Sequence, residues 1–157
     1  MDKLTLCLWF DNQAEEAAKF YTSLFTNSKI DKITYYGDEG PGRKGSVMTV
    51  IFHLGDQEYM GLNGGPEYKF TPAISLMVYC QDQAEVDYYW ERLSEGGEKN
   101  VCGWLTDKYG VSWQVLPTLL GELMADKDAR KAQNVMHAML QMTKLDIAGL
   151  QAAYDQA

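Results

Sequence analysis

Apolar and polar positions follow an order that occurs twice along the chain. In the first part, an apolar run at residues 4–10 predicts a buried strand, and helical spacing follows in Ala17, Phe20, Tyr21, Leu24 and Phe25. Three later runs rich in β-branched and aromatic residues predict strands joined by glycine-containing turns, at 30–36, 46–54 and 57–63. This order of elements predicts a βαβββ module over residues 1–66.

The same order begins again after Pro72. The tripeptide Gln13-Ala14-Glu15 recurs as Gln83-Ala84-Glu85, each time at the start of a predicted helix. The elements predicted here are a strand, a helix and two or three short strands, at residues 73–80, 83–93, 98–102 and 111–116. Repetition of one supersecondary unit predicts a second βαβββ module over 72–117 and an α+β fold with curved mixed sheets.

Beyond Pro117 the pattern is helical. Apolar side chains recur at helical spacing in Ala132, Val135, Met136, Met139 and Leu140, and Asp146 offers an N-cap for a last helix. We therefore expect a helical C-terminal extension over residues 118–157, packed with the two modules into one compact domain. Because this apolar stripe and the concave face of a sheet need a partner surface, we also expect a homodimer.

Charge and cysteine content narrow the functional classes. The net charge is −8, from 22 acidic and 14 basic residues, and such a field repels nucleic-acid backbones and anionic lipid surfaces. The sequence shows neither a signal-peptide pattern nor an apolar run of membrane-spanning length. Cys7, Cys80 and Cys102 match no disulfide framework and no metal-binding spacing, so we expect each to be a small buried apolar residue. These features predict a cytoplasmic protein that binds neither nucleic acid nor membranes.

Residue types that often carry catalysis are few. The chain has two histidines, and we interpret His53, in a predicted strand, and His137, in the tail, as structural or surface residues. No serine or cysteine lies in a nucleophile motif, and no GxGxxG turn is present for a nucleotide-like cofactor. Four tryptophans and ten tyrosines are many for this length, so we expect some of them to line an apolar pocket.

Several segments resemble the vicinal oxygen chelate superfamily, which includes glyoxalases and bleomycin-resistance proteins. The doubled βαβββ pattern carries the general resemblance, together with Leu8-Trp9-Phe10-Asp11-Asn12 leading to Phe20-Tyr21. Residues 45–50, 62–66 and 102–105 resemble motifs of the PhnB-like subgroup, whose members are often described as 3-demethylubiquinone-9 3-methyltransferases. This resemblance covers nearly the whole chain. The resemblance implies the two-module fold and a superfamily whose usual chemistry depends on a metal.

The resemblance also implies where a metal would be held. Metal-binding members place His on the first strand, a carboxylate at the end of the fourth, His on the fifth and Glu on the eighth. In this sequence those positions fall on Leu6, Asn63, Ser75 and Gln114. None of the four offers an imidazole, thiolate or carboxylate, and a divalent ion would bind them poorly. We therefore expect no cofactor, and we expect these four residues to line a ligand pocket.

Three functions remain open at this point. The first is a homodimer that binds a small apolar or aromatic molecule without chemistry. The second is an enzyme that acts on a small metabolite, with a metal held through other ligands or with none. The third is a structural or regulatory dimer with a vestigial pocket. The uncharged residues at the four metal positions favour the first over the second.

Overall fold

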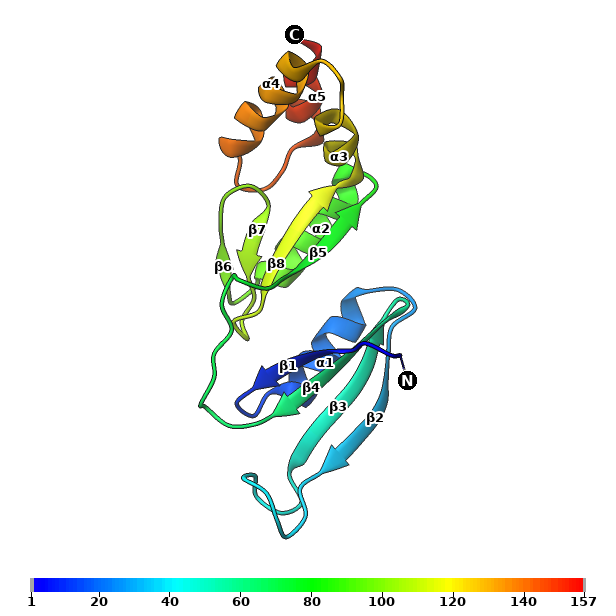
Figure 1. Cartoon of the computed structure of the whole chain (residues 1–157), viewed down its shortest axis with the longest axis vertical. Helices are drawn as coiled ribbons and strands as arrows, with labels where there is room; N and C mark the ends of the chain where they lie inside the picture. Colours follow the sequence, from blue (N-terminus) through cyan, green and yellow to red (C-terminus); the bar gives the residue numbers. More distant parts are fainter. Residues whose placement is uncertain (1, 157) are drawn as a thin grey trace. The chain divides into compact units, whose positions relative to one another are not determined.

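Two four-stranded mixed sheets organise the chain (Figure 1). The computed structural model describes residues 2–156, which divide into two compact units with the boundary between Phe70 and Thr71. Each unit contains one sheet, built in the order strand, helix and three strands. The predicted α+β class, with two βαβββ modules and a helical C-terminal segment, is confirmed.

The first unit has one helix and four strands. They are β1 (Leu6–Phe10), α1 (Ala14–Leu24), β2 (Lys29–Tyr35), β3 (Val47–Leu54) and β4 (Gln57–Asn63). The strand order is β1-β4-β3-β2, with β1 parallel to β4 and the other neighbours antiparallel. A tight turn joins β3 to β4, and Gly55 adopts a φ of 60° there, which favours glycine.

α1 covers one face of this sheet and builds the core of the first unit with it. The helical spacing of its apolar residues buries Ala14, Ala17, Ala18, Tyr21 and Leu24. Phe52 of β3 is 1% exposed, and its ring stacks on that of Tyr59 with centroids 5.4 Å apart. Side chains of alternate strand residues point to opposite faces, so each strand also presents residues on the face opposite α1.

The second unit repeats this arrangement with shorter strands. Its elements are β5 (Ser75–Cys80), α2 (Gln83–Ser94), β6 (Glu98–Lys99), β7 (Trp104–Thr106) and β8 (Ser112–Pro117), in the sheet order β5-β8-β7-β6. The strand predicted at 98–102 is wrong beyond Lys99. Cys102 and Gly103 have φ values of 59° and 81°, and two consecutive left-handed residues turn the chain before β7 begins.

The core of the second unit lies between its sheet and α2. Val86, Trp90 and Leu93 of the helix are at most 2% exposed. The turn between β7 and β8 is fixed by the buried Asp107 carboxylate, which accepts hydrogen bonds from Trp113 Nε1 at 2.8 Å and from the Val111 amide at 3.0 Å. The turn at residues 107–110 is thus held by the acidic side chain of its first residue.

Three helices follow the second sheet: α3 (Thr118–Met124), α4 (Ala129–Leu140) and α5 (Ile147–Asp155). They share a small apolar core formed by Leu123, Val135 and Leu150, against which Met139 packs. Met136 and Leu140 of the predicted stripe are 38% and 55% exposed. Val135 and Met139 of the stripe therefore pack inside the helical segment, whereas Met136 and Leu140 remain on its surface.

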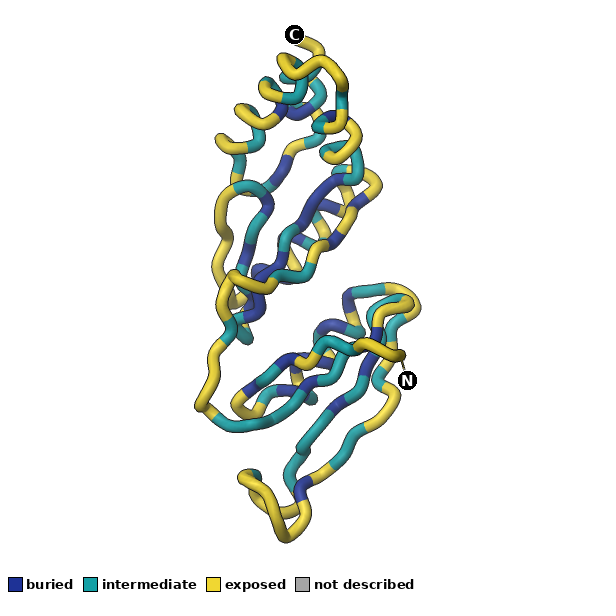
Figure 2. The backbone as a smooth tube through the Cα atoms, viewed as in Figure 1, coloured by how far each residue is buried: buried dark blue, intermediate teal, exposed yellow. Residues whose placement is uncertain are grey.

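Figure 2 shows how burial is distributed within each unit. Buried positions concentrate in the strands and on the inner sides of α1 and α2, whereas most of the residues between β2 and β3 are exposed. The segment 67–74, which includes the unit boundary, is also exposed at every position except Phe70. No helix of the described chain has the length and apolar character needed to cross a membrane.

Candidate functional site

The face of the second sheet opposite α2 carries two of the four predicted site residues. In the parallel pair β5 and β8, Met77 lies beside Gln114, and Ser75 is two residues before Met77 on the same face. Gln114 Nε2 donates a hydrogen bond of 2.9 Å to Ser75 Oγ. Met77 and Tyr79 on this face are 47% and 61% exposed. The structure thus brings Ser75 and Gln114 together within a partly apolar surface.

Leu6 and Asn63 lie apart in the first unit. β1 and β4 run parallel with Leu6 beside Tyr59 and Phe10 beside Asn63, so four residues of rise, about 13 Å, separate the predicted pair. Both residues belong to the side of the sheet that α1 covers. Leu6 shares a face with the buried Leu8 and Phe10, and Asn63 binds the first residue of α1.

The expected convergence therefore fails for this pair. Leu6 begins β1, whereas Asn63 lies beside the last residue of that strand, so the two side chains are at opposite ends of one face. That face is the one α1 covers, and a position found by counting reaches the opposite face after a shift of one residue. Cys7, next to Leu6, is exposed on the face opposite α1. Whether Ser75 and Gln114 bind a ligand stays a prediction.

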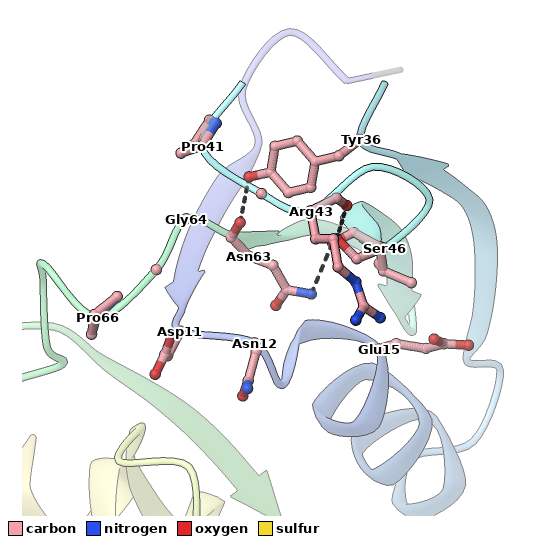
Figure 3. A pocket seen from close by; sticks show the side chains of 13 residues that line it. Asp11, Asn12, Glu15, Tyr36, Pro41, Arg43, Ser46, Asn63, Gly64 and Pro66 are labelled. Atoms are coloured by element: carbon pink, nitrogen blue, oxygen red, sulfur yellow. Dashed lines mark hydrogen bonds between the residues drawn. The ribbon is translucent and has the colours of Figure 1, made fainter. Parts of the chain in front are cut away.

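Asn63 has a framework role in the structure. Its Oδ1 accepts a hydrogen bond of 2.8 Å from the Ala14 amide at the start of α1, where the N-cap residue Gln13 makes no side-chain cap. Its Nδ2 donates to the Val47 carbonyl at 3.1 Å, and its own carbonyl accepts from Tyr36 Oη at 2.5 Å (Figure 3). One side chain therefore ties a helix start to a strand start.

A cavity of about 480 Å³ lies beside Asn63 in the first unit (Figure 3). Its walls come from the β1–α1 connection, the β2–β3 loop and the residues after β4. Asp11, Asn12 and Arg43 line it, and none of these three side chains has a hydrogen bond or ion pair within residues 2–156. Glu15 pairs instead with Lys19 at 2.9 Å. The cavity thus offers one free acidic, one free amide and one free basic group.

A second cavity, of about 240 Å³, lies in the second unit near the start of β8. Its lining includes Pro72, Asn100, Val101, Trp104, Thr106 and Ser112. Ser112 is 2% exposed, and its hydroxyl has no hydrogen-bond partner in the part of the chain that the structure describes. Ser112 lies beside Ser75 in the sheet and two residues before Gln114. Ser112 is not among the site residues predicted from the sequence, although alternation along β8 places it on the face of Gln114.

Polar side chains also meet on the first sheet. His53 Nδ1 forms a short hydrogen bond with Asp31, and Thr5 Oγ1 donates to the buried Glu58 at 2.5 Å. His53 and Glu58 are neighbours across β3 and β4. The bond to His53 holds the pKa of Asp31 below its ordinary value, and Lys29 contributes in the same direction. Between residues 2 and 156, no three His, Cys, Asp or Glu side chains form a group suited to a metal.

The three cysteines differ in environment. Cys80 is buried as predicted, and burial is the main cause that raises the pKa of its thiol to about 12, which makes it a poor nucleophile. The prediction is wrong for Cys7, which is exposed because it alternates with Leu6 and Leu8 along β1. Cys102 is half-buried, and all three thiols are free.

Comparisons with known proteins agree on one relationship. A family model described as 3-demethylubiquinone-9 3-methyltransferase matches residues 2–116. A solved structure titled putative 3-demethylubiquinone-9 3-methyltransferase, PhnB protein, from Bacillus cereus is 40% identical, with a TM-score of 0.69 over 74% of this chain and 100% of that chain. Protein PA1353 from Pseudomonas aeruginosa is 20% identical, with a TM-score of 0.62 over 74% of this chain and 98% of that chain.

A more distant solved structure has the same fold. The fosfomycin resistance protein FosX from Mesorhizobium loti is 15% identical, with a TM-score of 0.51 over 73% of this chain and 91% of that chain. No curated protein sequence matches this chain. The helices after β8 lie beyond the residues that the family model matches.

Proposed function

The chain belongs to the 3-demethylubiquinone-9 3-methyltransferase family, the PhnB-like branch of the vicinal oxygen chelate fold, and from this premise we propose that it is a homodimer that binds a small uncharged molecule without a metal ion. The methyl transfer named in the family description is not part of this proposal. β1 passes to α1 through Asp11, Asn12 and Gln13, without the glycine-rich turn that commonly binds nucleotide-like cofactors.

The observation that carries the proposal is the hydrogen bond between Gln114 and Ser75. The resemblance assigns a metal-binding His and a metal-binding Glu to these two strand positions. Here the positions hold two neutral side chains that bond to each other at 2.9 Å, and neither supplies the imidazole or carboxylate that a transition metal requires. The four positions do not fit a metal, so no step through a metal is proposed.

The surroundings of this pair suit an uncharged ligand. Met77 and Tyr79 supply exposed apolar and aromatic surface, and Trp104 lies beside Gln114 across β7 and β8. A mostly apolar surface with a few polar groups that fix orientation is the usual composition of a small-molecule site. A hydrogen bond to such a group contributes about 1 kcal/mol net, which orients a ligand without dominating its affinity.

Two exposed apolar areas support the homodimer. One is the face with Met77 and Tyr79, and the other is the surface of α4 with Met136 and Leu140. Exposed apolar side chains of this kind often mark contacts with another chain.

The three free thiols support the cytoplasm as the compartment of this protein, because the cytoplasm keeps cysteines reduced.

An enzyme that acts on a small metabolite is the second candidate. It is favoured by His53, whose Nδ1 is bound to Asp31 and whose cross-strand neighbour is the buried Glu58. An aspartate bound to Nδ1 orients a histidine for proton transfer through Nε2. Substitution His53→Gln separates the candidates, because a binding protein keeps its ligand affinity when this side chain is changed.

Elemental analysis and light scattering test the proposal. Protein purified without chelator should contain far less than one transition metal per chain, and its mass in solution should be about twice the 17.8 kDa chain mass. A stoichiometric metal that is lost in Gln114→Ala would contradict the metal-free site. A monomer at high concentration would contradict the homodimer and leave the ligand site to be tested by itself.

A further inference from the structure

The buried hydroxyl of Ser112 has an unusual position for a serine. The residue is 2% exposed and lines the 240 Å³ cavity of the second unit, and its Oγ has no hydrogen-bond partner within residues 2–156. Burying a hydroxyl without a partner is costly, and buried polar groups are satisfied in the great majority of cases. An unpaired hydroxyl on a residue of the cavity wall is therefore a group that a ligand can satisfy once a small rotation about the Cα–Cβ bond turns it toward the cavity.

The rest of the cavity wall defines what such a ligand can be. The lining residues carry no charge, and they combine the Trp104 ring, the apolar Pro72 and Val101, and the Thr106 hydroxyl. An apolar cavity of about 150 Å³ is large enough to hold benzene. A volume of about 240 Å³ therefore admits one substituted six-membered ring, for which the indole of Trp104 offers an aromatic contact.

The cavity residue Ser112 is a neighbour in the sheet of the pair Ser75 and Gln114. Ser112 lies beside Ser75 in β8 and β5, and Thr106 lies beside Ser112 in β7 and β8. Ser75 Oγ already accepts a hydrogen bond from Gln114, whereas the Ser112 hydroxyl is free to donate and to accept. Of the two serines, only Ser112 lines the cavity, and its hydroxyl is the one without a partner in the described residues.

We propose that the Ser112 cavity is the subsite for the polar end of a neutral single-ring molecule, whose hydroxyl or carbonyl oxygen binds Ser112 Oγ while its ring lies against Trp104. This inference rests on the proposed function, that the face of the second sheet opposite α2 binds a small molecule. The subsite adds Ser112 Oγ as the atom that recognises the polar group of the ligand, and its volume limits the ligand to one ring.

Phenol and toluene form a matched pair of probes, since they are nearly equal in size and only phenol has a hydroxyl. Each is titrated into the full chain, and the amide resonances of Thr106 and Ser112 are followed by NMR. Wild-type protein should bind phenol about fivefold to tenfold more tightly than toluene. Ser112→Ala should bind both within about twofold of each other, with toluene affinity close to that of wild type.

Two further variants keep the test decisive. Ser112→Cys retains a weak donor of similar size and should show an intermediate preference, which covers the case in which Ser112→Ala is poorly folded. Gln114→Ala should weaken the binding of both probes but keep the preference for phenol, because it leaves the Ser112 hydroxyl in place.

An undiminished preference in Ser112→Ala overturns the subsite. If Gln114→Ala then loses the preference, the polar group binds at Gln114 and the proposed function stands without the subsite. If neither probe shifts any resonance on this face of wild-type protein, the subsite and the proposed binding face both fail.

Discussion

Replacement of Asn63 by alanine tests whether this residue is part of the framework or of a ligand pocket. The side chain makes two hydrogen bonds, to the Ala14 amide at 2.8 Å and to the Val47 carbonyl at 3.1 Å, and both are partly buried. Asn63→Ala removes both bonds and leaves the amide at the start of α1 without a partner, since Gln13 provides no side-chain cap. The expected effect is therefore on the stability of the first unit.

The size of the effect follows from the two lost bonds. At about 1 kcal/mol for each bond, Asn63→Ala should lower the free energy of unfolding of the first unit by about 2 kcal/mol. For a unit of this size that corresponds to a decrease of about 10 °C in thermal midpoint. Asn63→Asp keeps the acceptor for Ala14 but not the donor for Val47, so it should lose about half as much.

Urea denaturation and hydrogen exchange measure this effect. Exchange at the Ala14 amide should become faster in Asn63→Ala than in wild type, because this amide loses its acceptor. Asn12→Ala is the matched control, since its exposed side chain has no hydrogen bond in the described chain. If Asn63→Ala leaves stability within about 0.5 kcal/mol of wild type and weakens ligand binding instead, the framework role is refuted.

Two other changes in the first unit have defined outcomes. A Cβ at Gly64 would lie 2.3 Å from the Trp9 ring, so Gly64→Ala should destabilise the unit by about 1–3 kcal/mol in urea, whereas Gly37→Ala, with nothing within 4 Å, should not. Hydrogen bonding to His53 lowers the pKa of folded Asp31, so its stabilising effect is present above about pH 3.9 and is lost as the pH falls through the lowered value. Wild type should therefore be more stable than Asp31→Asn at pH 5, and the difference in urea midpoint should disappear in stronger acid; a constant difference contradicts this assignment.

The fold could be predicted because its signals are local. The apolar spacing that places Tyr21 and Leu24 on the buried side of α1 is visible in the sequence, and so is the repeated order of elements. The break between β6 and β7 could not be predicted, since it depends on left-handed conformations at Cys102 and Gly103. Cysteine only rarely adopts such a conformation, so its identity gave no signal.

The site could be predicted only in part because it depends on strand faces. Ser75 and Gln114 meet because the register of β5 and β8 places them on one face. Leu6 and Asn63 do not meet, since Leu6 begins β1 whereas Asn63 lies beside the last residue of that strand. Both also lie on the face that α1 covers, and a shift of one residue in the counting exchanges the faces. Ser112 has the alternation of a site residue, but the absence of a partner for its hydroxyl is visible only in three dimensions.

Native mass spectrometry of the protein purified from cells, followed by identification of any small molecule that it releases, tests the central claim most directly. The claim is that the face carrying Ser75 and Gln114 binds a neutral small molecule without a metal. We expect the wild-type chain to retain a neutral ring compound, and Gln114→Ala to retain markedly less at a nearly unchanged thermal midpoint. Equal retention by wild type and Gln114→Ala, or a retained metal ion in place of an organic molecule, would contradict the claim.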